Sequence, residues 1–528
     1  METKPAARGH QFVTIGAGMT RREMLALTAL GLASGAPGMT WAAAPQGELS
    51  WGIHTTLAPT WFDPAETPGI ITPFMVLYAL HDALVKPMPE APLAPALAES
   101  WSASEDALTY EFVLRNGITF HDGEPVTAED VKFSFERYRG NSASLIKDRV
   151  AAIDMPDPRH VRFKLKQPWP DFITFYATAS GAAWIVPKKY VEKVGEDGFK
   201  KAPIGAGPYK FVSFNPGVEL VMEANEKYWR KTPAVKRLVF KVIPDEATRL
   251  AALKRGEVDI VYSIRGELAE EVQRSPGLTL KPVYPPAPFW LYFPDQWDPQ
   301  SPWHDVRVRR AANLAIDRKT INEAQTLGFS KLTGSLIPDS FEFYWAPPAP
   351  VFDPAAAKKL LAESGHPNGF NAGEYTCDSS YANLGEAVIN NLREIGIRAN
   401  LRPLERASFF EAYGNKKLKN IVQSGSGAFG NAATRLEAYV VKGGTYSYGS
   451  YPEIDELFKQ QAVELDHKRR AVTLEKIQQL LHEKAIYAPI WQLAFINAYG
   501  PRVAEPGFGL IPTFAYTGPY EDITLKSG

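Results

Sequence analysis

The chain of 528 residues has a single cysteine, Cys377. One cysteine cannot form an internal disulfide, nor a cysteine-based zinc or iron–sulfur site, which needs several thiolates. A lone thiol becomes a nucleophile only beside an activating base, so a buried, unreactive thiol is the simpler interpretation. The sequence therefore predicts neither a disulfide scaffold nor a thiolate metal site.

An excess of charge of either sign is also missing. The chain has 58 basic and 59 acidic residues, with a formal net charge of −1. Nucleic-acid binding usually needs clustered basic residues, so no nucleic-acid partner is expected. The hydrophobic fraction of 45% and the charged fraction of 22% are typical of a soluble globular protein. Beyond the N-terminal segment, no uncharged run approaches the roughly 20 residues that span a bilayer.

Local signatures of catalysis are absent as well. The sequence contains no H-E-x-x-H, P-loop or G-x-S-x-G pattern. None of the nine histidines has another histidine two to four residues away, so no local metal site is visible. His54 and His81 lie near the ends of expected elements, where structural roles are common. We therefore expect no catalytic residue, no metal and no cofactor.

One glycine-rich stretch matches the glycine spacing of a dinucleotide-binding site. Residues 425–430 read Gly-Ser-Gly-Ala-Phe-Gly and follow an expected strand at 420–423. The dinucleotide fingerprint also needs a helix that begins on the glycines and an acidic residue about 20 positions later. Asp455 comes too late, so a glycine-rich loop in a ligand cleft is the preferred interpretation.

The N-terminal segment 1–44 has the three parts of an export signal. Arg21 and Arg22 precede an uncharged run over 24–36, and alanines at 42–44 offer a cleavage site. The paired arginines behind Thr20 favour the twin-arginine route, and a Sec-type signal is the alternative. Pro45 leaves open whether cleavage follows residue 42 or 44, and translation can begin at Met1 or Met19. No cysteine follows the run, so a soluble periplasmic protein without a lipid anchor is expected.

The rest of the chain alternates between strand and helix patterns. Strands are predicted at 48–54, 237–243, 258–262 and 397–401, and helices at 127–135, 245–253, 353–364 and 384–394. Asn116-Gly117 predicts a hairpin between strands 108–114 and 118–120. This alternation predicts an α/β protein with mixed sheets. No long flexible linker occurs, so short crossovers should join the domains, as in hinged lobes.

Four stretches together resemble the family 5 extracellular solute-binding proteins, the peptide, nickel and opine group. They cover residues 98–131, 205–260, 305–318 and 360–397, and include Tyr-Glu-Phe-Val-Leu-Arg-Asn-Gly-Ile-Thr-Phe-His-Asp-Gly at 110–123. The resemblance implies the substrate-binding component of an ABC importer, which is not an enzyme. Such a component is expected to be a monomer that closes on a small organic solute and delivers it to permease subunits at the inner membrane.

The resemblance also implies a two-lobed periplasmic-binding-protein fold of class II type, with mixed sheets, a hinge and an extra inserted domain. The expected segments are the first lobe at 45–90, 203–284 and 490–528, the inserted domain at 91–202, and the second lobe at 285–489.

In peptide-binding members of this family, a loop close to Gly-Trp-x-Ala-Asp-Tyr holds the α-ammonium of the ligand through its aspartate. In the matching stretch here, Phe429 takes the place of the aspartate and Ser426 that of the tryptophan, with Gly427 beside them. A phenyl ring cannot pair with an ammonium as a carboxylate does. Arg406 stands where relatives often have tryptophan, and it can receive a carboxylate or phosphate with two hydrogen bonds; the alternative is a solvated surface arginine. These departures favour an opine, a sugar acid or a modified peptide over a simple free-amine peptide.

Aromatic residues complete the predicted ligand site. Trp61, Trp290, Tyr292 and Tyr413 lie where strand ends should reach the cleft, although any of these rings can equally belong to the core.

Two other functions remain open on the sequence. The twin-arginine route exports folded proteins, so a periplasmic enzyme with a bound cofactor is one alternative. A peptide chaperone or sensor without transport would have the same cleft.

Overall fold

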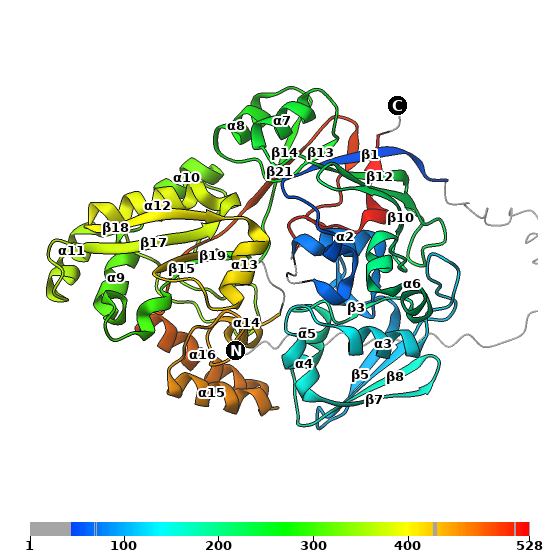
Figure 1. The fold of residues 1–528 in the computed structure, drawn as a ribbon, viewed down its shortest axis with the longest axis horizontal. Coiled ribbons are helices and arrows are strands. Elements are labelled where there is room, and N and C mark those ends of the chain that lie inside the picture. The colour runs from blue at the N-terminus through cyan, green and yellow to red at the C-terminus, as the bar shows by residue number, and fades with distance from the viewer. Residues whose placement is uncertain (1–43, 68, 70, 426–429, 512–513, 527–528) are drawn as a thin grey trace, which may run out of the picture. The chain divides into compact units, whose positions relative to one another are not determined.

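The structure of the protein is a computed structural model that describes residues 44–67, 69, 71–425, 430–511 and 514–526 (Figure 1). Residues 1–43 of the predicted export signal 1–44, and with them the possible cleavage site after residue 42, lie outside these residues. Two large mixed sheets and one smaller antiparallel sheet organise the described part. The predicted mixed α/β fold is confirmed.

The first lobe is built on a seven-stranded sheet whose strands come from three distant parts of the chain. β1 lies inside this sheet, parallel to β12 on one side and to β13 on the other. Its Trp51 is fully buried against the rings of Phe240, Tyr262, Phe508 and Tyr520. In spatial order the strands are β10 (Tyr209–Asn215), β11 (Glu219–Ala224), β12 (Val235–Val242), β1 (Gln46–Ile53), β13 (Ile260–Val261), β21 (Phe495–Tyr499) and β14 (Thr279–Val283).

The predicted β-α-β unit in this lobe is confirmed. Helix α7 (Glu246–Lys254) joins β12 to β13, and Asp245 caps it by accepting the backbone N–H of Thr248 at 2.8 Å. Gly256 follows the helix with a φ of 71°, a backbone conformation that favours glycine. In the sheet, β1 from the N-terminal part of the chain lies between the two strands of this unit, β12 and β13. The sequence of the unit alone does not predict this inserted strand. Helices α2 (Thr72–Leu80) and α8 (Gly266–Arg274) also belong to this lobe.

The second lobe contains a six-stranded sheet and eight helices of the described chain. The predicted helices at 353–364 and 384–394 and the strand at 397–401 are confirmed as α11, α12 and β18. The strands are, in spatial order, β16 (Lys331–Leu332), β20 (Tyr487–Gln492), β15 (Pro288–Tyr292), β19 (Ile421–Gly425), β17 (Phe370–Asp378) and β18 (Ile397–Leu404). The helices are α9 (Val306–Ala315), α10 (Arg318–Thr326), α11 (Pro354–Glu363), α12 (Ala382–Glu394), α13 (Arg406–Gly414), α14 (Ala432–Tyr439), α15 (Pro452–Val463) and α16 (His467–Glu483).

A small domain carries the four-stranded antiparallel sheet. The pairing of its strands shows that the predicted hairpin is wrong. β6 pairs with β5 and β8, and residues 118–120 form no strand beside it. Those residues instead turn back on their own chain, since Phe120 N–H donates to the Glu124 carbonyl at 2.8 Å. The elements are β5 (Ala98–Ala103), β6 (Thr109–Leu114), β8 (His160–Leu165), β7 (Val150–Asp157), α3 (Ala128–Arg137), α4 (Ala143–Arg149), α5 (Phe172–Ala177) and α6 (Lys188–Lys201).

Short paired strands complete the fold. They are β2 (Asp82–Ala83) with β9 (Trp184–Ile185), β3 (Val85–Met88) with β4 (Ala91–Pro95), and β22 (Val503–Glu505) with β23 (Thr524–Leu525).

Two short crossovers join the large sheets, where β21 and β14 run beside each other in Figure 1. One crossover is residues 284–287 and the other is residues 493–494. Leu493 N–H donates to the Ala287 carbonyl at 2.8 Å and ties the two together. Short paired crossovers of this kind suit a hinge, as the sequence predicts. The exact segment boundaries given above stay predictions.

Candidate functional site

A cavity of about 1350 Å³ lies between the first lobe, the small domain and the second lobe. Ordinary small-molecule pockets occupy roughly 300–1000 Å³, so this space can hold a solute larger than a single amino acid together with water. Its lining includes Thr55, Trp61, Phe495 and Tyr516 from the first lobe, residues 139–145 and Asp148 from the small domain, and Phe289, Asp378, Tyr381, Arg406, Phe410 and Glu437 from the second lobe.

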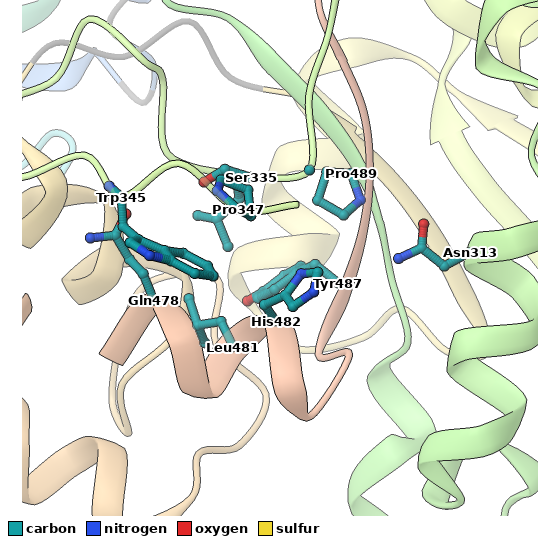
Figure 2. Close-up of a pocket in the computed structure, with 11 residues that line it drawn as sticks. Asn313, Ser335, Trp345, Pro347, Gln478, Leu481, His482, Tyr487 and Pro489 are labelled. Carbon is teal, nitrogen blue, oxygen red and sulfur yellow. The ribbon is translucent and has the colours of Figure 1, made fainter. Parts of the chain in front are cut away.

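A second pocket lies within the second lobe and is far smaller. Figure 2 shows its lining, which includes Asn313, Trp345, Gln478 and Tyr487. Its volume of about 30 Å³ has room for one or two water molecules. The large cavity is therefore the candidate site for a solute.

Arg406 provides a cation on the floor of the large cavity. It opens helix α13, and its Nη1 donates to Asp378 Oδ2 at 2.8 Å. The Arg406 side chain is 21% exposed. Burial alone would lower the pKa of Arg406, but Asp378 and the hydroxyl groups of Tyr381 and Tyr516 outweigh that effect and raise it. The guanidinium therefore stays charged, and only one of its five N–H groups is used by Asp378.

The opposite end of the cavity joins the small domain to the second lobe through buried charges. Asp171, which immediately precedes α5, forms an ion pair with Arg470 on α16. The same carboxylate accepts from Asn431 Nδ2 at 2.7 Å. Nearby, Arg149 Nη2 donates to Glu437 Oε1 at 2.9 Å. These contacts hold the small domain to the second lobe, and Glu437 is the member of this group that lines the cavity.

Glu437 gives this end of the cavity a pH-dependent charge. Burial is the main cause that raises its pKa to about 7; Asp171 adds to the rise and Arg149 opposes it. A raised pKa means that the closed form keeps a proton that an open or unfolded form loses near the ordinary value of 4.5. Stability contributed by this group is therefore complete at low pH and declines as pH rises from about 4.5 to about 7.

Glu437→Gln should remove this dependence. Because glutamine cannot ionise, the variant should gain stability relative to the wild type as pH rises from about 4.5 to about 7, by on the order of 2–3 kcal/mol. Thermal unfolding followed at several pH values measures the difference. Glu411→Gln is the control, since Glu411 also lines the cavity but is exposed and forms no ion pair within the described chain. A constant gap between Glu437→Gln and wild type across the pH range would contradict the interpretation.

The structure brings together only part of the predicted site. Arg406 and Trp61 both line the cavity. Ser426, Gly427 and Phe429 lie outside the described residues, so the substitution of phenylalanine for the family's aspartate stays a prediction.

Trp290, Tyr292 and Tyr413 require a correction, because the structure places them in the core of the second lobe. The Trp290 ring meets the Tyr439 ring edge-on at 5.0 Å, and Tyr292 stacks on Tyr487 at 5.1 Å. All three side chains are almost fully buried, and none lines the cavity. Alternate residues of a strand face opposite sides of the sheet, so it is Phe289, one position earlier, that reaches the cavity.

His54 is a feature that the sequence prediction missed. His81 follows expectation, since its Nε2 lies 2.9 Å from the Phe62 carbonyl oxygen. His54 does not: the side chain is buried, yet neither ring nitrogen has a hydrogen-bond partner within the described chain. Its place at the end of β1, just before the cavity residues Thr55 and Thr56, was the only available signal.

Two negative findings hold for the part of the chain that the structure describes. Among the described residues, no group of three or more histidine, cysteine, aspartate or glutamate side chains is arranged to hold a metal ion. The same part of the chain has no helix whose length and hydropathy would let it cross a bilayer.

Comparison with known proteins identifies the class. The two lobes around a large cleft are those of the periplasmic binding proteins. A complex of AgaA from A. tumefaciens R10 with agropinic acid has a TM-score of 0.79 and 25% sequence identity, over 91% of this chain and 99% of that one.

The chain belongs to the bacterial extracellular solute-binding proteins, family 5, whose model for the middle region matches residues 92–447. The probable di/tripeptide-binding protein 5 of Pseudomonas aeruginosa is 26% identical over 483 residues, which are 85% of this chain and 91% of the relative. The glutathione-binding protein GsiB of Salmonella typhi is 25% identical over 520 residues, 95% and 98% of the two chains. The chain is thus a solute-binding component of an ABC importer, as the sequence predicts.

Proposed function

We propose that this protein captures a small organic solute with at least one acidic group in the cavity between its lobes and delivers it to permease subunits. The observation that supports this most is Arg406, a charged side chain on the floor of a cavity of about 1350 Å³. Its relatives include proteins named for di- and tripeptides, for glutathione and for agropinic acid. Opine-like acids and modified peptides fit an arginine anchor better than a solute that carries only a free amine.

The proposal is tested by identifying the solute. Mass spectrometry of the protein purified from its native host should detect a bound acid, and thermal-shift measurements should rank agropinic acid, glutathione and simple di- and tripeptides. Equal stabilisation by a peptide and by its C-terminal amide, which has no acidic group, would contradict the proposed need for an acid.

Arg406→Ala should weaken binding of such an acid by about ten- to a hundredfold, because a charged hydrogen bond contributes roughly 1.5–3 kcal/mol. Isothermal titration calorimetry with the solute identified above measures the change. The alanine variant also leaves the buried Asp378 without its partner, so Arg406→Ala combined with Asp378→Asn separates lost binding from local disruption. Unchanged affinity in both variants would remove Arg406 from the site.

We further propose that the protein binds its solute without altering it, acts as a monomer and reaches the periplasm through the twin-arginine signal. Membership of a binding-protein family supports the first point, and no comparison supports the alternative of a cofactor-dependent enzyme. Prolonged incubation should return the solute unchanged; conversion to a product would reverse this assignment. Export assays with Arg21→Lys and Arg22→Lys together test the route.

A further inference from the structure

A cluster of polar groups, some of them without a hydrogen-bond partner in the described chain, lies under the cavity floor at the hinge. It consists of His54, Arg249, Arg265, Tyr381, Arg406 and Tyr516, and we refer to it as the hinge cluster. His54 is 9% exposed, and both of its ring nitrogens lack a hydrogen-bond partner in the described chain, as does Nε of Arg265. The His54 ring lies 4.5 Å from the Tyr516 ring, which lines the cavity.

The charges of three guanidinium groups act on this histidine. Burial is the main reason that the pKa of His54 lies well below its usual value, and the charges of Arg249, Arg406 and Arg265 lower it further. The ring is therefore neutral, with one N–H donor and one acceptor. It cannot take up a proton to compensate for a missing partner.

The positive charge of the hinge cluster is only partly balanced. Arg406 pairs with Asp378, whereas Arg249 directs its hydrogen bonds to the backbone carbonyls of 243, 244, 262 and 263. Within the described chain, no carboxylate oxygen comes within 4.0 Å of a side-chain nitrogen of Arg249 or Arg265. Glu246 accepts the backbone N–H of Arg265, and Glu246 and Asp245 both act on Arg249 through their charges. Within the described chain, Asp378 is therefore the one carboxylate that pairs directly with a guanidinium of the hinge cluster.

We propose that the hinge cluster is a binding subsite for a compact anion, the carboxylate of the solute, held by His54 and Arg406 and favoured by the charge of Arg265. The inference rests on the proposed function and adds the position and chemistry of one ligand group. A cationic group would be repelled there, and an apolar group would leave the buried donors unpaired at a cost of roughly 1–3 kcal/mol each. A carboxylate supplies both the acceptors and a direct ion-pair partner for these guanidinium groups.

The position of the subsite links binding to closure. His54, Arg265 and Tyr516 belong to the first lobe, whereas Tyr381 and Arg406 belong to the second. Arg265 already crosses the hinge, since its Nη2 donates to the Ser380 carbonyl at 2.9 Å and its guanidinium carbon lies 5.1 Å from the Tyr381 ring centroid. An anion that contacts both lobes stabilises the closed form selectively, because those contacts separate when the cleft opens.

The test uses a matched pair of probes that does not depend on knowing the solute. Crystals are soaked at millimolar concentration with 4-bromobenzoate or with the neutral 4-bromobenzamide, and the bromine is located by anomalous scattering. The acid should place its carboxylate within hydrogen-bond distance of His54 and Arg406, and the amide should not occupy that position. Absence of the acid from the hinge cluster, or equal occupancy by the amide, would overturn the proposal.

Affinities in solution provide the second measurement. His54→Phe keeps the ring against Tyr516 but removes both nitrogens, and Arg265→Met removes the charge. Each should raise the Kd for 4-bromobenzoate by about ten- to a hundredfold, and Arg265→Lys should recover part of the loss. Arg255→Met is the matched control, because Arg255 ends helix α7 on the protein surface and, within the described chain, forms its one ion pair with the nearby Glu257. Equal affinities in wild type, His54→Phe and Arg265→Met would overturn the proposal, provided that all four variants fold normally.

The same variants separate this inference from the proposed function. If glutathione or agropinic acid binds wild type and His54→Phe equally well, the protein remains an acid-binding receptor but the subsite is wrong. If neither solute binds and 4-bromobenzoate still occupies the hinge cluster, the subsite stands and the proposed solute class is wrong.

Discussion

Trp51→Ala should destabilise the protein by about 3–5 kcal/mol, the range found when a buried aromatic side chain is truncated to alanine. Trp51 is fully buried in β1, and four aromatic rings from β12, from beyond β13 and from the C-terminal segment pack around it. These rings come from three separate parts of the chain, so they cannot close over the space without displacing strands. Both the transfer of apolar surface and the residual cavity therefore contribute to the loss.

Urea unfolding followed by circular dichroism measures this change through the midpoint, with the slope compared between variants. Trp51→Phe should lose less, because a ring still fills part of the space. Val472→Ala is the surface control, since Val472 is 67% exposed and its truncation should change stability by about 0.5 kcal/mol or less. A Trp51→Ala midpoint as close to wild type as that of Val472→Ala would contradict the packing described for the first lobe.

The first lobe shows which parts of the fold were predictable from sequence. Helices α3 and α7 have local signals: Thr127 with Asp130 forms a capping box, and Asp245 and Gly256 mark the two ends of α7. These signals act over a few residues and can be read directly. The partner of a strand is set by contacts far along the chain, so the pairing of β6 with β5 and β8 was not accessible, and Asn116-Gly117 indicated a hairpin that does not form.

In the candidate site, too, some features were predictable from the sequence and others depend on contacts between distant parts of the chain. Arg406 was predicted from its place in a family pattern, and it lines the cavity. Along β15 the predicted residues Trp290 and Tyr292 do not line the cavity and their neighbour Phe289 does, because periodicity does not say which face of a strand meets the ligand. His54 was assigned a structural role because the three arginines around it, at 249, 265 and 406, lie about 200 residues or more away in sequence. Only the folded chain brings those charges together.

Asp171→Asn should weaken solute binding on the order of a hundredfold by opening the cleft. Asp171 is 3% exposed and balances Arg470, which is also buried. Removing one member of a buried ion pair usually costs about 3–5 kcal/mol, because the remaining charge stays desolvated. Here the small domain and the second lobe can separate, so Arg470 can regain water without unfolding. The cost of the substitution therefore shifts the protein toward the open form, and affinity falls with the closed population.

Small-angle X-ray scattering distinguishes this opening from unfolding. Without solute, Asp171→Asn should have a larger radius of gyration than wild type and an unchanged far-ultraviolet circular dichroism spectrum; with saturating solute, the two should converge. Asp154→Asn is the matched control, since Asp154 belongs to the same domain and pairs with Lys164 at the exposed surface, where such pairs contribute about 0–1 kcal/mol.

A double variant shows whether charge or shape holds the cleft closed. Asp171→Leu with Arg470→Met replaces the ion pair by apolar side chains, an exchange that is often neutral or stabilising in protein interiors. The amide oxygen of Asp171→Asn can still accept from Asn431, whereas Asp171→Leu removes that acceptor, so recovery in the double variant would occur despite this additional loss. If the double variant recovers the compact form and the affinity, desolvation of Arg470 is the force that opens the single variant. If it stays as open as Asp171→Asn, the ion pair itself provides closure, and the explanation based on an uncompensated charge is wrong.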